Sequence, residues 1–457
     1  MTIRLLSLAA TGCLALAAGS LALGYEPVYD AWAWLVWGRE LAGLGLDVSS
    51  GPSWKPLPVA LAAVLSAAGD AAPEAWIVLV RAAWLLALVL AAELAVRLSP
   101  PDAGRGARVA AGSFAAGSLA LLADPVTPWA RQAAGGMSEP LLVALVLGAV
   151  RAHVGGRPRA AVVLGALAGL VRPEAWPLLA VLGVWRWREQ PAARPLLVAI
   201  TLALPALWLG PELLASGDAP GAAGRARRGG ADALEVLGRA AALPLAAAWP
   251  LALVAAAGRD RRMRVLAAGA LAWIAIVAAM TAVGFPGLPR FMAPAAAVAG
   301  VLGGAGLARV AGSMRRPAVA AVAAALAVVT AVELPGRVAE LPRALRTTAD
   351  SAGSHDRLRA LARSLGRERL LACGDLATSD VLVRTALAWE LELPLSRVVS
   401  FGVAPRLSGA FVVGPGAGRR LHRELRSLGE PLGARGEWRV YSLDCPAASA
   451  GVSGARR

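Results

Sequence analysis

The chain of 457 residues is strongly apolar and basic. Of its residues, 57% are hydrophobic and 17% are charged, the mean hydropathy is +0.60, and the formal net charge is +16. An ordinary soluble domain has roughly 25% charged residues, and a soluble chain of this length cannot bury so much apolar surface. The composition therefore excludes a single soluble enzyme, a disordered protein and a fibrous protein, and it indicates a membrane protein.

Eleven apolar stretches, separated by short polar breaks, are candidates for membrane-spanning helices. A helix that crosses the membrane needs about 20 mostly apolar residues, and the two stretches around Arg172 are short. We therefore expect a mainly α-helical membrane protein with about 11 transmembrane helices. The stretches cover residues 5–23, 74–98, 108–123, 138–153, 159–172, 173–186, 195–212, 240–257, 265–284, 291–309 and 317–333.

Arginines concentrate in alternate connections between these stretches. If Arg4 keeps the N-terminus in the cytoplasm, that side holds seventeen arginines and only three acids, Asp102, Glu189 and Asp260. Such an excess is typical of cytoplasmic loops. With an odd number of spans, the tail beyond Glu333 then lies outside the cell membrane. The net positive charge follows mainly from this topology, which removes the main argument for nucleic acid as a partner.

The first stretch resembles a secretory signal, with Arg4 followed by an apolar run and small residues. The sequence Ala10-Thr11-Gly12-Cys13 resembles a lipoprotein cleavage site. Because the apolar run continues past Cys13 to Leu23 and ten more stretches follow, we expect an uncleaved signal anchor.

Residues 24–73 form the expected first outer loop. A stripe of apolar residues at helical spacing after Pro27 predicts an amphipathic helix, which would lie along the membrane surface with its indoles in the interface. The run Leu57–Ala68 is too short to span and is expected to pack as a re-entrant or surface helix. The stripe consists of Trp34, Trp37, Leu41 and Leu44.

Residues 1–334 form the expected transmembrane domain, and residues 335–457 a small α/β domain outside the membrane. In an oxidising compartment Cys373 and Cys445 would either form a disulfide or stay as two free buried thiols, and the sequence leaves both open. In this domain we expect helices near 354–366 and at 379–392 and 418–428, and strands at Leu370–Cys373, Arg397–Phe401, Ala410–Val413 and Trp438–Leu443.

Metal binding through soft ligands is not indicated. The chain has three cysteines and three histidines, without the CxxC spacing of zinc ribbons or iron-sulfur sites. The histidines, His153, His355 and His422, are too scattered for a catalytic triad, and we assign them no role. No glycine-rich phosphate loop occurs in a strand-helix setting, so the sequence shows no cytosolic nucleotide site.

Charged residues at the membrane ends of helices are unfavourable there, and they are therefore candidates for function. Those on the expected outer side come from separate loops, which indicates a shared external cavity. They are Glu26, Asp30, Lys55, Arg131, Glu139, Arg172, Glu174 and Arg290.

Asp30 lies near the start of the expected surface helix, close to Trp32 and Trp34. Apolar surroundings raise the pKa of a carboxyl group towards neutrality, and such a carboxylate suits a general base that takes a proton from an acceptor hydroxyl. Alternatively, Asp30 only complements the helix dipole. The sequence leaves both interpretations open.

Two interfacial cations suit the phosphate of a lipid head group. Lys55 follows Trp54, and Arg290 follows Pro289 at the outer mouth of the tenth span. An arginine binds phosphate through two hydrogen bonds, and a lysine binds it as a point charge. The alternative for both residues is snorkelling to the interface.

Arg172 and Glu174 flank Pro173, which bars a regular helix through that point. Either the two charges form a local ion pair that closes a tight hairpin, or Arg172 contacts phosphate while Glu174 orients a sugar hydroxyl or the catalytic loop. Glu139 follows Ser138 at the expected outer start of a span. For Glu139, capping of that helix is the alternative to a role in the site.

Taken in chain order, these short motifs resemble those of the glycosyltransferase C superfamily. The likeness is closest to the branch that contains protein O-mannosyltransferases and the aminoarabinose transferases that modify lipid A, and it covers about residues 1–335. The motifs are Tyr29-Asp30, Trp54-Lys55-Pro56-Leu57, Ser138-Glu139-Pro140, Leu170-Val171-Arg172-Pro173-Glu174 and Pro289-Arg290-Phe291, followed by Pro294.

This resemblance implies an inverting transferase that moves a sugar from a polyprenyl-phosphate donor to an acceptor hydroxyl outside the cytoplasm. Asp30 matches the family's first-loop acid, which acts as the base or positions the acceptor. Lys55 and Arg290 match cations expected to contact phosphate, and Glu139 matches an acid of a later outer loop. The other residues expected to bind substrate are Arg172, Glu174, Glu26 and Trp54.

The first loop departs from the family's pattern. Many relatives carry two adjacent acids, whereas Asp30 is followed by Ala31 and the nearest other acid is Glu26. A metal bridged by paired acids is therefore in doubt. The sequence identifies no certain cofactor, and a divalent cation held by oxygen ligands stays open.

Two other functional classes stay open. A transporter or lipid flippase would show interrupted helices in corresponding positions of two halves, with polar groups near the membrane midplane. Here the polar groups gather at the outer ends, which favours an enzyme at the interface. A noncatalytic membrane scaffold would leave Asp30 replaceable. The sequence identifies neither the sugar, hexose or pentose, nor the acceptor, which is a glycan, a glycolipid or a protein.

Overall fold

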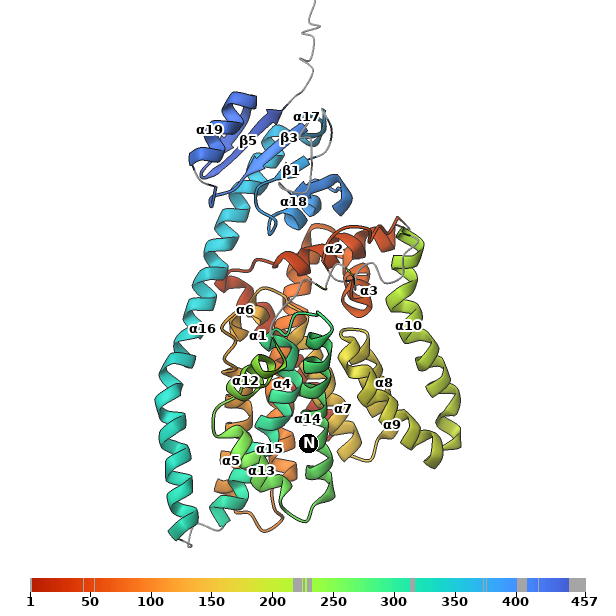
Figure 1. Ribbon diagram of the computed structural model, residues 1–457, viewed down its shortest axis with the longest axis vertical. Coiled ribbons are helices and arrows are strands. Elements are labelled where there is room, and N and C mark those ends of the chain that lie inside the picture. The colour runs from red at the N-terminus through yellow and green to blue at the C-terminus, as the bar shows by residue number, and fades with distance from the viewer. Residues whose placement is uncertain are drawn as a thin grey trace, which may run out of the picture.

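The computed structural model consists of a helical bundle with a small mixed sheet at one end (Figure 1). We call the end of the bundle that carries the sheet the domain end. The structure describes residues 2–43, 45–52, 54–216, 224, 227, 232–312, 317–372, 374, 376–400, 409–417 and 419–443.

Helix α15 (Ala293–Gly312) is the centre of the bundle, and most of its residues are buried. It consists largely of alanine and glycine, so neighbouring helices approach it closely. The helices that pack directly against it are α4 (Ala72–Leu98), α5 (Arg105–Ala120), α7 (Glu139–Val154), α13 (Ala248–Ala256) and α14 (Arg261–Ala282). Helix α1 (Ile3–Gly19) packs on α4, and α12 (Ala233–Ala242) packs on α14.

Glycines in α15 make the closest of these helix contacts. A Cβ atom at Gly304 would lie 2.3 Å from the carbonyl oxygen of Ala111 in α5. One at Gly306 would lie 2.0 Å from the carbonyl oxygen of Leu251 in α13. Both distances are far below van der Waals contact, so this packing requires glycine at the two positions.

Six helical segments among the described residues are long and apolar enough to cross a membrane. The predicted count of eleven is therefore not confirmed. The stretches 108–123, 138–153, 159–172 and 173–186 form helices of 12–16 residues, and the stretch 240–257 is interrupted between α12 and α13. The six segments are Ile3–Leu23, Pro56–Leu98, Pro191–Ala215, Arg261–Ala282, Pro289–Gly312 and Pro317–Leu365.

Three helices lie at one side of the bundle, and the first of them packs on α7 (Figure 1). They are α8 (Pro158–Gly169), α9 (Trp176–Glu189) and α10 (Arg194–Ser216). A 3₁₀ turn at Pro173–Ala175 joins α8 to α9. Pro173 and Pro177 fix the chain direction here, and the break between the two stretches around Arg172 is the one that the sequence indicates.

Helix α2 (Tyr29–Ala42) confirms the helix predicted in the first loop, but its surroundings differ from the prediction. Trp34 and Trp37 are fully buried and do not lie in a membrane interface. The ring of Trp34 packs against Trp76 of α4, and that of Trp37 packs against Trp54. The C-terminal domain covers another side of α2. Trp34 and Trp37 are therefore buried by protein, whereas Leu41 of the same stripe is 36% exposed.

Helix α3 (Pro56–Leu65) is short and packs on α2, in agreement with the prediction for the second apolar run. The contact is close, because a Cβ atom at Gly38 would lie 2.6 Å from Ala62. A turn at Ser66–Ala71 then reverses the chain into α4, with Gly69 in the left-handed region at φ 57°.

Helix α16 (Pro317–Leu365) runs along the bundle from the end opposite the sheet to the sheet itself (Figure 1). It joins the stretch 317–333 and the separate helix predicted near 354–366 into one helix of 49 residues. Pro335 and Pro342 lie inside it and do not end it. Arg337 anchors the helix to the bundle, because it donates hydrogen bonds to the carbonyl oxygens of four residues: Leu121, Ala242, Leu243 and Pro244.

The C-terminal domain contains a five-stranded sheet of order β2-β1-β3-β5-β4, in which β1 pairs with β2 and β3 in parallel and the other pairs are antiparallel. The strands are β1 (Leu376–Thr378), β2 (Val398–Ser400), β3 (Gly409–Val413), β4 (Gly429–Arg435) and β5 (Trp438–Leu443). The helices are α17 (Arg367–Leu371), α18 (Arg384–Glu390) and α19 (Arg419–Leu428). Most predicted elements of this α/β domain are confirmed.

Two predictions for this domain are wrong. Residues 370 and 371 of the strand predicted at Leu370–Cys373 belong to α17, and the first strand begins at Leu376. Strand β4 is not predicted, because it is rich in glycine and charge and lies at the sheet edge, where pairing with β5 stabilises it. Leu44, Cys373, Phe401 and Cys445 lie outside the described residues, so the choice between disulfide and free thiols is not tested.

The close packing of α15 gives a stability prediction. Replacement of Gly306 by alanine forces α13 away from α15, and we expect the free energy of unfolding to fall by about 1–3 kcal/mol. The measurement is the thermal unfolding midpoint of the purified protein in detergent. Gly269→Ala in α14 is the matched control, because a Cβ atom there meets nothing within 4 Å. Equal thermal unfolding midpoints for the two variants would contradict the close packing of α15 on α13.

Candidate functional site

Four charged segments meet at the domain end of the bundle, and each precedes or begins a helix. Proline is among the first residues of each helix or turn, a position where its missing N–H is not needed. Lys55 precedes α3, Glu139 begins α7, Arg172 precedes the turn before α9, and Arg290 lies in the turn before α15. The local sequence therefore places all four charges at helix starts.

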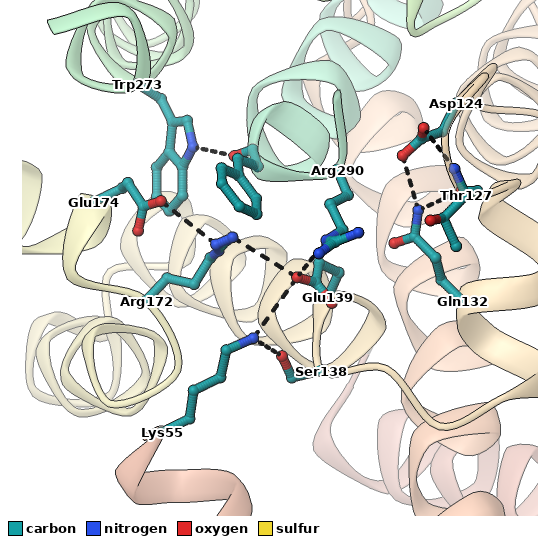
Figure 2. Close-up of polar contacts among 11 residues, drawn as sticks. Lys55, Asp124, Thr127, Gln132, Ser138, Glu139, Arg172, Glu174, Trp273 and Arg290 are labelled. Carbon is teal, nitrogen blue, oxygen red and sulfur yellow. Dashed lines mark hydrogen bonds and ion pairs between the residues drawn. The ribbon is translucent and has the colours of Figure 1, made fainter. Parts of the chain in front are cut away.

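Glu139 is the common partner of the three cations (Figure 2). Its Oε1 atom lies 3.7 Å from Lys55 Nζ, 3.8 Å from Arg172 Nη2 and 3.7 Å from Arg290 Nε. The side chain of Glu139 is 1% exposed. Lys55 also donates a hydrogen bond of 2.7 Å to the hydroxyl of Ser138. A single buried carboxylate thus holds cations from three other segments.

Aromatic rings lie against all three cations, and Arg290 is the most distant, at 5.5 Å from the ring centre of Phe291. The guanidinium of Arg172 lies 3.5 Å from the ring centre of Phe291, and Lys55 Nζ lies 4.9 Å from that of Trp34. Trp273 fixes the backbone of Phe291 by donating a hydrogen bond of 2.8 Å to its carbonyl oxygen. Cation–π contacts of this kind hold a cation in place without using its hydrogen-bond donors.

Several polar atoms of this cluster are buried without a hydrogen bond within the described structure. They are both carboxylate oxygens of Glu139, Nε of Arg172, Nε of Arg290 and Oε2 of Glu174. The ion pairs to Glu139 are longer than hydrogen bonds, and the pair between Arg172 Nη1 and Glu174 Oε1 measures 3.5 Å. Buried donors without partners are uncommon in native proteins. The cluster therefore retains donor capacity for an anionic group.

Asp30 lies in the first turn of α2, within the electrostatic reach of this cluster. Burial raises the pKa of its carboxyl group, while the charges of Lys55 and Arg290 oppose the rise. Burial likewise lowers the pKa of Lys55, and Glu139 opposes that change. No hydrogen bond or ion pair to the Asp30 carboxylate occurs within the described residues, so this group is available to a ligand.

A backbone hydrogen bond and side chains of α4 hold the loop of Asp30 against the loop that leads to Glu139. The amide of Val28 donates a hydrogen bond of 2.9 Å to the carbonyl oxygen of Gly135, and Trp76 donates one of 2.9 Å to that of Gly136. Arg81 donates to carbonyl oxygens on both sides, those of Gly24 and Ala134. The acid in the first loop and the carboxylate of α7 therefore belong to one rigid unit.

The structure brings together six of the eight predicted site residues: Asp30, Lys55, Glu139, Arg172, Glu174 and Arg290. Glu26 and Trp54 have other partners. Trp54 donates a hydrogen bond to the carbonyl oxygen of Leu207 in α10, and Glu26 accepts one from Trp32 and faces His355. Position along the chain does not distinguish these two residues from the others, because Trp54 belongs to a quoted motif and Glu26 lies shortly before another.

Sequence reasoning missed four residues that support the site: Ser138, Trp34, Trp273 and Phe291. Ser138 and Phe291 belong to the quoted motifs, and their position beside charged candidate residues could have indicated a role in the site. Trp34 was assigned to a membrane-facing stripe. Trp273 lies in the middle of α14, and no local pattern distinguishes it from an ordinary core residue.

The cluster does not fit a divalent cation. No group of three or more His, Cys, Asp or Glu side chains suited to a metal occurs in the described part of the chain. Glu139 is also surrounded by three cations, and these would repel a metal ion. The donor set suits an anion, such as a phosphate.

The arrangement of the bundle and the terminal sheet is also found in solved structures. In particular, the chain is similar to crystal structures of ArnT, a lipid A aminoarabinose transferase, from Cupriavidus metallidurans. ArnT bound to undecaprenyl phosphate matches with a TM-score of 0.58 and 16% identity over 99% of both chains. Apo ArnT matches with the same TM-score and identity, over 96% of this chain and 97% of that one.

No protein-family model matches the chain, and no curated protein matches it by sequence. At 16% identity, the likeness to ArnT shows the fold alone.

The ion cluster gives a second stability prediction. Glu139→Gln keeps the shape of the side chain but leaves three buried cations without their shared counter-charge. We expect a loss of about 3–5 kcal/mol in the free energy of unfolding, measured as a lower thermal midpoint. Glu235→Gln, in a surface ion pair with Arg239, is the control and should change the free energy by no more than about 1 kcal/mol. Similar effects of the two variants would refute the role assigned to Glu139.

Proposed function

We propose that this protein is a membrane glycosyltransferase that moves a sugar from a polyprenyl-phosphate donor to an acceptor hydroxyl. The observation that carries the proposal is the convergence of Lys55, Arg172 and Arg290 beside the available carboxylate of Asp30. A phosphate leaving group needs cations, and an acceptor hydroxyl needs a base. Both requirements are met within one cluster.

The three cations would hold the phosphate of the donor. Glu139 keeps them together in the absence of a ligand, and its long ion pairs leave their donors available to phosphate oxygens. The ArnT structure bound to undecaprenyl phosphate supports this class of ligand. An apolar groove of about 740 Å³ between α9 and α10 includes Trp176, close in sequence to Glu174, and suits an isoprenoid chain.

Transfer would proceed by direct displacement. The acceptor hydroxyl gives its proton to Asp30 while its oxygen attacks the anomeric carbon of the sugar. The bond between that carbon and the phosphate oxygen breaks, the electron pair leaves with the phosphate, and the configuration inverts. Lys55, Arg172 and Arg290 stabilise the departing charge, and Glu174 would orient Arg172 or a sugar hydroxyl.

The arginine distribution supports an orientation with the N-terminus in the cytoplasm and the domain end outside the cell membrane. The catalytic cluster and the C-terminal domain then face the same compartment. The donor sugar is a hexose or a pentose, and the acceptor is a glycan, a glycolipid or a protein. A transporter or flippase is disfavoured, because the charges of the candidate site gather at one end of the bundle rather than at its midplane.

The first test of this function is Asp30→Asn. Loss of the base should lower kcat by a factor of about 10²–10⁴, with little change in KM for the donor. Because burial raises the pKa of Asp30, the wild-type rate should also fall as the pH is lowered through that pKa. The assay follows transfer from a panel of polyprenyl-phosphate sugars by the purified protein.

Asp70→Asn is the matched control, since Asp70 is an exposed carboxylate in the same first loop. It should leave the rate unchanged. Full activity of Asp30→Asn would eliminate Asp30 as the base, and absence of transfer with every donor would argue against the enzyme.

The second test concerns the phosphate. Lys55→Met removes one charge-assisted contact, and we expect the affinity for undecaprenyl phosphate to fall by a factor of about 10–150. Binding is measured by titration of the lipid into detergent-solubilised protein. Undecaprenol, which lacks the phosphate, should bind wild type and variant equally. Arg131→Gln serves as a control cation outside the cluster, and an equal loss for both variants would contradict a specific phosphate site.

A further inference from the structure

His355 occupies a buried position between two carboxylates from distant segments. Its Nδ1 atom lies 3.4 Å from Glu26 Oε1, and its Nε2 atom lies 3.1 Å from Glu390 Oε1. The residue is 7% exposed. His355 belongs to α16, Glu26 to the loop before α2, and Glu390 to α18 of the C-terminal domain. One imidazole therefore joins three parts of the chain that are remote in sequence.

The same cluster holds the helix that carries Asp30. Trp32, one helical turn from the start of α2, stacks on His355 at 5.1 Å and donates a hydrogen bond of 2.9 Å to Glu26. Further contacts tie α18 to α2: the hydroxyl of Thr385 donates to the carbonyl oxygen of Tyr29, the residue before Asp30. The C-terminal domain thus helps to set the position of the proposed base.

The two carboxylates differ in their other partners. Glu390 accepts hydrogen bonds from Arg359, at 2.7 Å from Nη2 and 2.8 Å from Nε, so a permanent cation balances its charge. Within the described residues, the direct partners of Glu26 are the imidazole and the indole of Trp32. The remaining titratable groups that act on Glu26, or on its neighbour Tyr25, are Asp356, Arg359 and Glu74.

Both ring nitrogens of His355 face carboxylate oxygens. An ionised carboxylate can accept hydrogen bonds but has no proton to donate. A neutral imidazole has one N–H donor and one acceptor nitrogen, so in that form one nitrogen would face an acceptor without a proton between them. The pair formed by Glu26 and His355 is therefore tight only while it holds a proton. Burial raises the pKa of Glu26 to about 7, against the opposing effects of His355 and Trp32.

We propose that His355 is a positioning residue that holds α2, and with it Asp30, against the C-terminal domain while the Glu26–His355 pair carries its proton. Loss of that proton to water, as the pH of the surrounding compartment rises, loosens the contact. The effect on sugar transfer rests on the proposed function, whereas the effect on α2 does not.

The sign of the pH dependence follows from the raised pKa of Glu26. The folded state holds the proton to about pH 7, and an unfolded glutamate loses it near pH 4.3. The stability from this pair is therefore complete at low pH and is lost as the pH rises to about 7. We expect the thermal midpoint of the wild type to fall by about 3–6 °C between pH 5 and pH 8.

The test compares the full-length wild type with Glu26→Gln and His355→Gln, and His422→Gln is the control for a histidine elsewhere in the C-terminal domain. Thermal midpoints and hydrogen exchange of residues 29–42, corrected for intrinsic rates, are measured from pH 5 to pH 8.5. In the wild type and the control, the midpoint should fall and the exchange should rise with pH. In Glu26→Gln both changes should disappear, because the amide keeps an acceptor for Trp32 and cannot titrate.

Activity supplies a separate readout. The wild-type kcat should decline on the alkaline side, and Glu26→Gln should remove that decline without changing KM for the donor. The proposal is overturned if the thermal midpoint and the hydrogen exchange of Glu26→Gln depend on pH as they do in the wild type. It is also overturned if the midpoint of Glu26→Gln no longer depends on pH while the exchange of α2 still does. If no donor supports transfer, the proposed function fails, and the stability and exchange measurements still decide the role of His355. If His355→Gln does not fold, Glu26→Gln carries the test alone.

Discussion

The buried carboxylate of Glu139 is the interaction on which the site depends. Lys55, Arg172 and Arg290 come from three different segments, and in a medium of low dielectric constant they would repel one another without it. Glu139 can hold them because α7 begins at that residue, at the same end of the bundle as the other helix starts. Its contacts are ion pairs rather than hydrogen bonds, so the cations remain available to an anionic ligand.

The first loop links this cluster to the C-terminal domain. Helix α2 packs against α3 and α4 on one side and against α18 on another, and it places Asp30 beside the cations. The continuous helix α16 carries the domain to this position and is anchored to the bundle by Arg337. The C-terminal domain, which the sequence predicts as a separate unit, thus helps to hold the proposed base in position.

Much of the site was predictable because its charges are unusual at the ends of apolar stretches. Lys55, Glu139, Arg172 and Arg290 each lie next to a proline, and a proline-marked helix start is visible in the sequence. The partners of Glu26 were not predictable, since His355 lies far along the chain and no local pattern connects them. The burial of Trp34 was not predictable for a related reason. An apolar stripe has the same sequence pattern whether lipid or protein covers it.

The sequence by itself determined the membrane class, the helical architecture, the positions of the helix starts and most of the terminal α/β elements, because these follow from local hydropathy, charge and proline. Only the tertiary structure decided the lengths and ends of the shorter helices, the unbroken course of α16, the shared carboxylate of Glu139, and the contact of Glu26 with His355. These features depend on packing between segments remote in sequence, and the energy of such contacts is set by burial and by the partner that each charge meets after folding.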